Sequence, residues 1–215
     1  GVVPSTKWKK EAIGQNWYLG ETLITGIGQG YIQSTPLQLT LMTAQLANGG
    51  NKIYPTLIPN NKHLDQIKRE MDANEDYDLP TSHPPLVRNK ENVKFVLDAM
   101  FKSTNEVYGT SYSSRIEDPK YQFAGKTGTA QVKRITEAER ELDRKLEQIP
   151  YKERDHAWYI AFGPYKNPRY AMTVLVEHGG SGSSAAAPIA KKLFKKIIDR
   201  HEEREKIRNS NILTS

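Results

Sequence analysis

The sequence predicts a mixed α/β fold of the α+β type, in which an antiparallel sheet is flanked by helices. Two runs rich in aromatic and β-branched residues, 156–163 and 169–177, are separated by a break that contains Pro164 and Pro168, which is typical of a β-hairpin. A third strand-like run occupies 121–133. Apolar residues recur at helical spacing before and after these runs. We therefore expect three successive antiparallel strands covered by helices, with strand 121–133 nearest a cleft.

The first helix with a clear start signal is expected after Thr35. Thr35 suits the N-cap, Pro36 suits the first helical position, and Gln38 completes the spacing of a capping box. A Gly-Gly pair at 49–50 predicts a left-handed stop. The broad apolar face between these signals consists of Leu37, Leu41, Met42, Ala44 and Leu46. We expect this helix to be structural and to lie under the site in the cleft.

A second expected helix ends near residue 105. Its apolar stripe consists of Val93, Leu97, Met100 and Phe101. The triplet Ser103-Thr104-Asn105 follows and has the Ser-x-Asn form of a catalytic motif. Such side chains also bond to the backbone where helices end. Because the triplet directly continues the stripe, we interpret it as the end of a helix.

The last helix is expected to start at Pro188. The apolar stripe that should cover the sheet consists of Ile189, Leu193, Phe194, Ile197 and Ile198. The lysines that should face water are Lys191, Lys192, Lys195 and Lys196. The preceding segment 179–184 lacks the Gly-Lys-Ser/Thr ending of a phosphate loop, so it predicts a tight, flexible turn.

Two polar segments are expected to leave the body of the fold. Residues 59–85 are rich in charge and interrupted by prolines, which indicates an exposed excursion. In the second segment, 134–155, Thr136 and Glu139 have capping-box spacing. Apolar residues then recur at helical intervals up to Pro150, and they are Ala138, Leu142, Leu146 and Ile149. This pattern predicts a short amphipathic helix that lies beside the cleft, docks a partner or is simply solvated.

The composition narrows the function classes. The chain has 215 residues, of which 37% are hydrophobic, so it is long enough for one packed core. The absence of cysteine excludes disulfides and thiolate metal sites, and no pair of histidines has metal-ligand spacing. The net charge of +6 permits contact with anionic surfaces, but acidic residues balance the lysines and no nucleic-acid-binding motif is present. We expect no metal, no nucleic-acid partner and no membrane-spanning segment within this sequence.

The triplet Lys126-Thr127-Gly128 carries the clearest chemistry. On a strand edge, these residues offer a cation, a hydroxyl and uncovered backbone to an extended substrate. Lys126 would attract a carboxylate or a neighbouring catalytic hydroxyl, and Thr127 would donate to the same carboxylate. The backbone N–H of Thr129 would help to stabilise an oxyanion. The triplet is one of three local signatures of serine acyl-enzymes that handle penicillin-like substrates, although glycine in a strand can also mark a simple packing contact.

Several other segments accompany the triplet in a characteristic order. These segments are 3–4, 8–10, 27–38, 125–131, 155–162, 177–180 and 183–188. Together they resemble class B penicillin-binding proteins of the elongation type over nearly the whole chain. A β-lactamase or a carboxypeptidase could carry the same triplet, but segments 27–38 and 155–162 favour a transpeptidase.

The resemblance implies a penicillin-binding and serine β-lactamase-like fold and a division of the chain. Residues 1–205 would be the C-terminal part of a transpeptidase domain, and residues 206–215 would be a polar tail. Segments 59–85 and 134–155 would be insertions in that domain.

The resemblance also implies a peptidoglycan D,D-transpeptidase that works by serine acyl transfer and binds β-lactams without a cofactor. Lys126, Thr127 and Gly128 would be catalytic, and Thr127, Thr129 and Gln131 would bind the substrate. No serine in the sequence has a lysine three positions on, so the nucleophile motif Ser-x-x-Lys is expected upstream and this chain alone is expected to be inactive. A chain that supplies only part of the domain should also expose the apolar face that would pack on the missing part.

The partners implied by the resemblance are stem peptides of peptidoglycan, β-lactam antibiotics, a membrane-bound glycan polymerase and proteins of the elongation complex. The implied location is the bacterial inner membrane, with the catalytic domain on the periplasmic side and the anchor outside this chain. A non-catalytic scaffold or binding module of the same fold is the alternative function.

Overall fold

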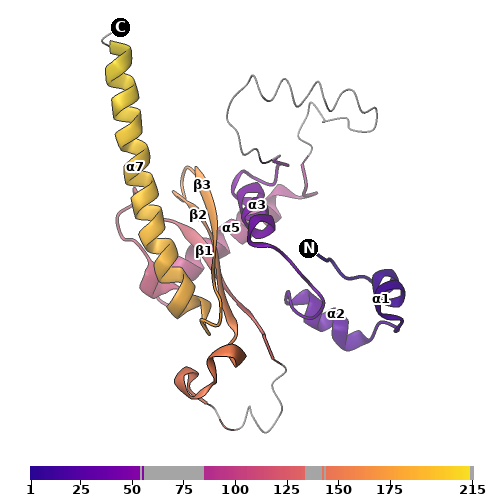
Figure 1. Cartoon of the computed structure of the whole chain (residues 1–215). Coiled ribbons are helices and arrows are strands. Elements are labelled where there is room, and N and C mark those ends of the chain that lie inside the picture. Colours follow the sequence, from indigo (N-terminus) through magenta and orange to yellow (C-terminus); the bar gives the residue numbers. More distant parts are fainter. Residues whose placement is uncertain (54, 56–84, 134–141, 143, 214–215) are drawn as a thin grey trace.

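The computed structural model describes residues 1–53, 55, 85–133, 142 and 144–213, with side chains described up to residue 207. Figure 1 shows a small sheet with helix α7 (Ala187–Leu213) along one side and helices α3 (Pro36–Ala47) and α5 (Lys90–Asn105) on the other. The N-terminal segment with α1 (Thr6–Ile13) and α2 (Leu19–Gly26) lies apart from the sheet. The described residues therefore form a layered body with an extended arm.

The sheet has the predicted antiparallel topology. Strands β1 (Ala124–Ala130), β2 (His156–Gly163) and β3 (Tyr170–Val176) pair in the order β1-β2-β3. The two runs of the hairpin are confirmed, whereas the strand expected over 121–133 is shorter at both ends. β2 is the central strand, and β3 is the second edge of this three-stranded sheet. The edge strand that carries the triplet is β1.

The core on the α7 side combines large rings with small residues. Phe123, Tyr159 and Phe194 are fully buried, and the Phe123 and Phe194 rings stack with their centroids 5.0 Å apart. The alanines that complete this core are Ala157, Ala161, Ala186, Ala187 and Ala190. Alanine lets the helix lie close to the sheet, so the two rings fill the space that remains.

The predicted apolar stripe of the last helix is wrong in part. Phe194 and Ile198 are buried as expected, but Ile189 and Leu193 are each 41% exposed. The small residues Ala187 and Ala190 occupy the sheet side in their place, because they share one helical face with Phe194 and Ile198. The helix also runs on to Leu213, through most of the segment 206–215 that we expected as a polar tail.

The opposite face of the sheet packs on α5 and α3. Met100 of α5 is buried with Ala124 and Phe162, and Leu97 packs against them. This arrangement confirms the predicted stripe of α5, which ends at Asn105 as expected.

The start and stop signals of α3 are confirmed. The Thr35 side chain accepts from the Gln38 N–H at 3.2 Å, and the Gln38 side chain accepts from the Thr35 N–H at 3.0 Å. Gly49 and Gly50 both adopt positive φ after the helix. The expected apolar face is only partly covered, since Leu37 and Met42 remain exposed while Thr43 is buried. The α3 helix packs on β3, where the Thr40 and Thr173 hydroxyls lie 2.9 Å apart.

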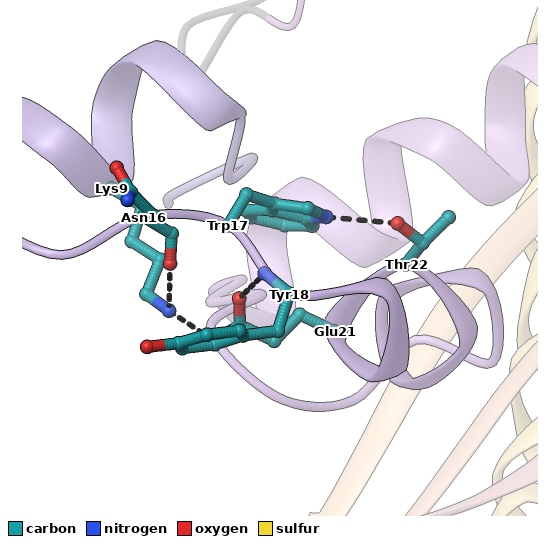
Figure 2. A network of polar contacts seen from close by, with 6 residues as sticks. All are labelled: Lys9, Asn16, Trp17, Tyr18, Glu21 and Thr22. Atoms are coloured by element: carbon teal, nitrogen blue, oxygen red, sulfur yellow. Dashed lines mark hydrogen bonds and ion pairs between the residues drawn. The ribbon is translucent and has the colours of Figure 1, made fainter.

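Polar contacts hold the N-terminal arm together. Figure 2 shows the Lys9 side chain reaching from α1 to the start of α2, where its ammonium donates to the Asn16 carbonyl at 2.8 Å and to the Glu21 carboxylate at 2.5 Å. The Lys9 side chain is only 1% exposed. Trp17 donates its indole N–H to the Thr22 hydroxyl at 2.8 Å. None of the residues of α2 is buried, and the buried residues of the arm are Pro4 and Lys9, so the arm has no extended apolar core.

The two expected insertions can be assessed only in part. The excursion at 59–85 and the predicted helix start at Thr136 and Glu139 lie outside the described residues, apart from Pro85. The described remainder of the second insertion contains two single 3-10 turns, η2 (Leu146–Gln148) and η3 (Tyr151–Glu153), so the amphipathic α-helix is wrong there. Leu146 packs against Gly180, where a Cβ atom would lie 2.6 Å from the leucine side chain, and this contact ties the segment to the glycine turn.

Candidate active site

A groove of about 730 Å³ runs along the exposed edge of β1. One wall is the strand itself with the residues that follow it, 126–133, and the opposite wall is part of the N-terminal arm, 28–30 and 32–34. Trp158 and Ile160 of β2 and Leu39 of α3 also line it. The groove therefore brings together three of the segments that carried the resemblance, 27–38, 125–131 and 155–162.

All five residues predicted for the site line this groove, and they are Lys126, Thr127, Gly128, Thr129 and Gln131. Lys126, Thr129 and Gln131 are exposed, and Thr127 is half-buried. The Lys126 ammonium donates to the Thr127 carbonyl at 2.8 Å and lies 3.4 Å from the Thr127 hydroxyl. A cation, hydroxyls and an open strand edge thus face one hollow, and this combination suits an extended ligand that bears a carboxylate.

Glycine is needed where the last turn before α7 meets the sheet. A Cβ atom on Gly182 would lie 2.3 Å from the Trp158 carbonyl oxygen and 2.8 Å from the Gly128 carbonyl oxygen. Gly182 opens a π-helical turn, Gly182–Ala186, that packs on β1 and β2. The glycine-rich segment is therefore a close backbone contact behind the triplet, and the expectation of a flexible turn is wrong for this part of it.

A row of hydroxyls lies behind the groove, and no motif in the sequence predicted it. The Thr110 hydroxyl is 3.3 Å from the Thr127 hydroxyl and 3.2 Å from the Ser103 hydroxyl. Ser103 lies near the end of α5, so the triplet Ser103-Thr104-Asn105 does close a helix as predicted. The only sequence signal for Thr110 is its place after Gly109, just beyond the end of that helix.

A buried polar cluster includes the residues that follow Ser103 and Thr110 in the chain. The Tyr159 hydroxyl lies 2.9 Å from the Thr104 hydroxyl and 3.1 Å from the Ser111 hydroxyl, and all three residues are buried. Burial raises the pKa of the Tyr159 phenol, against the opposing effect of these two hydrogen bonds. A Cβ atom on Gly125 would lie 2.4 Å from the Tyr159 ring, so the glycine before Lys126 makes room for the tyrosine.

The histidines near the strand ends have structural contacts. The backbone N–H of His178 donates to Nδ1 of His156 at 2.9 Å, and Nδ1 of His178 lies 3.0 Å from the Arg154 carbonyl. Neither ring lines the groove. Both residues are therefore hydrogen-bonded structural histidines.

A larger hollow of about 1180 Å³ lies between α7 and residues 113–117. Lysines of α7 line it, among them Lys192 and Lys196, and none of the predicted site residues does. We assign the candidate site to the smaller groove because that groove holds the convergent functional groups. Among the residues that the structure describes, no three histidine or acidic side chains gather as a metal site would require.

No helix within the described part of the chain has the length and apolar character needed to cross a bilayer.

Known proteins resemble this chain over most of its length. Residues 4–195 match the family described as "Penicillin binding protein transpeptidase domain". The peptidoglycan D,D-transpeptidase MrdA of Salmonella typhimurium is 33% identical over 93% of this chain, and MrdA of Haemophilus influenzae is 36% identical over 89%. The chain covers 30% and 28% of these two relatives, so it spans less than a third of their length.

Solved structures show the same similarity. Penicillin-binding protein 2 of Helicobacter pylori, solved in a complex with MreC, superposes with a TM-score of 0.71 at 32% identity over 93% of this chain and 31% of that protein. Penicillin-binding protein 2 of Pseudomonas aeruginosa, solved with the compound WCK 5153, superposes with a TM-score of 0.68 at 36% identity over 91% of this chain and 38% of that protein. The predicted fold class is thereby confirmed.

Proposed function

The chain belongs to the penicillin-binding protein transpeptidase family, and from this membership we propose that it is the part of a peptidoglycan D,D-transpeptidase that carries the Lys-Thr-Gly strand. The observation that carries the proposal is the groove in which Lys126, Thr127 and Thr129 meet along one open strand edge. The relatives named as peptidoglycan D,D-transpeptidases support the reaction type.

The reaction is an acyl transfer in two steps. A serine hydroxyl from protein outside this chain attacks the penultimate D-Ala carbonyl of a stem peptide, which forms an ester bond and releases the terminal D-Ala. An amine of a second stem peptide then attacks this ester, which forms the new peptide bond and returns the hydrogen to the serine. Both steps pass through a tetrahedral intermediate with a negatively charged oxygen.

The groove residues have distinct roles in this proposal. Lys126 supplies positive charge to the substrate carboxylate or to a catalytic hydroxyl, and the Thr127 hydroxyl donates to the same carboxylate. Gly128 keeps the strand edge open, and the backbone N–H of Thr129 stabilises the oxyanion. Gln131, exposed in the groove just after the end of β1, contacts the substrate beyond the reacting bond.

The proposal extends to partners and location. β-Lactams would bind in the same groove, since they also present a carbonyl and a carboxylate. The partners would include a membrane-bound glycan polymerase and elongation-complex proteins, which the relatives solved with MreC and in a peptidoglycan synthase complex support. The intact protein would be anchored in the inner membrane with this domain on the periplasmic side.

A non-catalytic scaffold of the same fold is the second candidate.

The decisive experiment is covalent labelling of the intact protein with a fluorescent penicillin. We expect Lys126→Ala to slow acylation on the order of 100-fold, because it removes an electrostatic group aimed at the reacting substrate. Lys166→Ala, an exposed lysine in the β2–β3 turn, is the matched control and should label at the wild-type rate. Wild-type labelling of Lys126→Ala would remove the triplet from the mechanism, and an unlabelled wild-type protein would favour the scaffold.

A further inference from the structure

The Thr127 hydroxyl has two polar neighbours that limit where its proton can point, one that lines the groove and one behind it. The Lys126 ammonium lies 3.4 Å away, and the Thr110 hydroxyl lies 3.3 Å away. An ammonium can only donate, whereas a hydroxyl donates once and accepts up to twice. If Thr110 also donates to Thr127, both acceptor positions of the Thr127 oxygen are filled and its single proton is left for a ligand.

The Thr110 hydroxyl has its own neighbour that completes a chain. The Ser103 hydroxyl lies 3.2 Å from it, so three hydroxyls follow one another from the end of α5 to the groove. A negative charge in the groove favours the direction Ser103 to Thr110 to Thr127, because protons then point towards the charge and each bond polarises the next. The spacings are long for O–H···O bonds, as catalytic hydrogen bonds often are before a ligand tightens them.

The backbone around Thr110 is held in place on both sides. A Cβ atom on Gly109 would lie 2.3 Å from the Ser103 carbonyl oxygen, so only glycine permits this close approach. The N–H and the hydroxyl of Ser111 both donate to that same carbonyl at 3.0 Å. The turn is thus locked against the end of α5, and Thr110 is presented at a fixed position behind β1.

Thr110 is exposed and does not line the groove, so its hydroxyl is required neither for the core nor for direct contact with a ligand. We propose that Thr110 is a positioning residue that orients the Thr127 hydroxyl as a hydrogen-bond donor to the carboxylate of the bound substrate or β-lactam. This inference rests on the proposed function. It adds a specific role for a side chain that touches neither the ligand nor the reacting atoms.

The test measures acylation of the intact protein by a β-lactam and by the methyl ester of the same β-lactam. We expect Thr110→Val to slow acylation by the free acid about tenfold, the equivalent of one lost hydrogen bond, and to slow acylation by the ester much less. Thr110→Ser should restore the wild-type rate because it returns the hydroxyl. Ser113→Ala, an exposed serine close by with no hydrogen bond to the groove, is the matched control and should change neither rate.

A double-mutant cycle keeps the test independent of folding. Thr110→Val should add nothing to Thr127→Val, because Thr110 acts only through the Thr127 hydroxyl. Equal loss with acid and ester, failure of Thr110→Ser to rescue, or additive losses in the cycle would each overturn the inference. A wild-type rate in Thr110→Val alongside a slowed Lys126→Ala would overturn it while leaving the proposed function intact. An unlabelled wild-type protein would overturn both this inference and the proposed function.

Discussion

The sheet body and the N-terminal arm are stabilised by different physical means. In the body, Phe123, Tyr159 and Phe194 are removed from water between the sheet and α7. In the arm, a buried lysine bonded to a carboxylate and a carbonyl joins α1 to α2. Helix α2 also exposes apolar side chains, since Leu19 is 81% exposed and Leu23 is 71% exposed. One wall of the groove belongs to the body with its apolar core, and the other belongs to the arm with its polar network. The two walls should therefore respond to different perturbations.

The largest effect should come from emptying the apolar core. Phe194→Ala removes a fully buried ring that stacks on Phe123, and we expect it to destabilise the body by about 3–5 kcal/mol. Leu193→Ala, on the same helix but 41% exposed, should cost about 1 kcal/mol or less. Thermal denaturation of the intact protein and its two variants measures the difference. Equal losses would mean that the sequence-based stripe, with Leu193 in the core, describes the helix better than the structure does.

An intermediate effect should follow from crowding the contact behind the triplet. Gly182→Ala places a methyl group against the Trp158 and Gly128 carbonyl oxygens, and we expect a loss of about 1–3 kcal/mol together with slower acylation by penicillin. Gly20→Ala in α2 is the matched control, because nothing lies within 4 Å of its Cβ position. It should be neutral or stabilise the arm by up to about 1 kcal/mol. A Gly182→Ala protein with wild-type stability and acylation would show that the close approach is not needed.

The smallest effect should be a dependence of the arm on pH. The hydrogen bond from Lys9, followed by that from the Tyr18 N–H, lowers the pKa of the Glu21 carboxyl below its ordinary value of 4.5. A carboxyl whose pKa is lower in the folded state stabilises that state above its ordinary pKa, and this contribution is lost as the pH falls through the lowered value. We therefore expect amide protection in 14–26, corrected for intrinsic exchange, to decrease below about pH 4.5 while protection in β2 stays constant.

Two substitutions separate this effect from general acid sensitivity. Glu21→Gln should abolish the pH dependence of protection in the arm, whereas Glu11→Gln, an exposed residue of α1, should leave it unchanged. If amide protection in the sheet and in the arm decreased together, the two regions would open as one unit, and the different means of stabilisation proposed for them would be wrong.

Much of the fold was predictable because local signals agreed with the packing. The capping box of α3, the end of α5 at Asn105 and the β2–β3 hairpin were each marked by residue types with a specific backbone role. The triplet also predicted the groove, since the role expected of Lys126-Thr127-Gly128 requires an open strand edge and β1 supplies one. The last helix was predicted less well, because spacing alone cannot reveal that small alanines, and not Ile189 and Leu193, fit against the sheet.

The sequence by itself determined most of the elements and the candidate side chains of the site, since caps, turns and the period of apolar residues are local properties. Only the tertiary structure decided which residues of other segments contact those side chains and their backbone. Thr110, Ser103 and Thr127 are brought into a row by the end of α5 and the edge of β1, and Gly182 meets Gly128 across 54 positions of sequence. Such contacts depend on how distant segments pack, so no local pattern in the sequence could have predicted them.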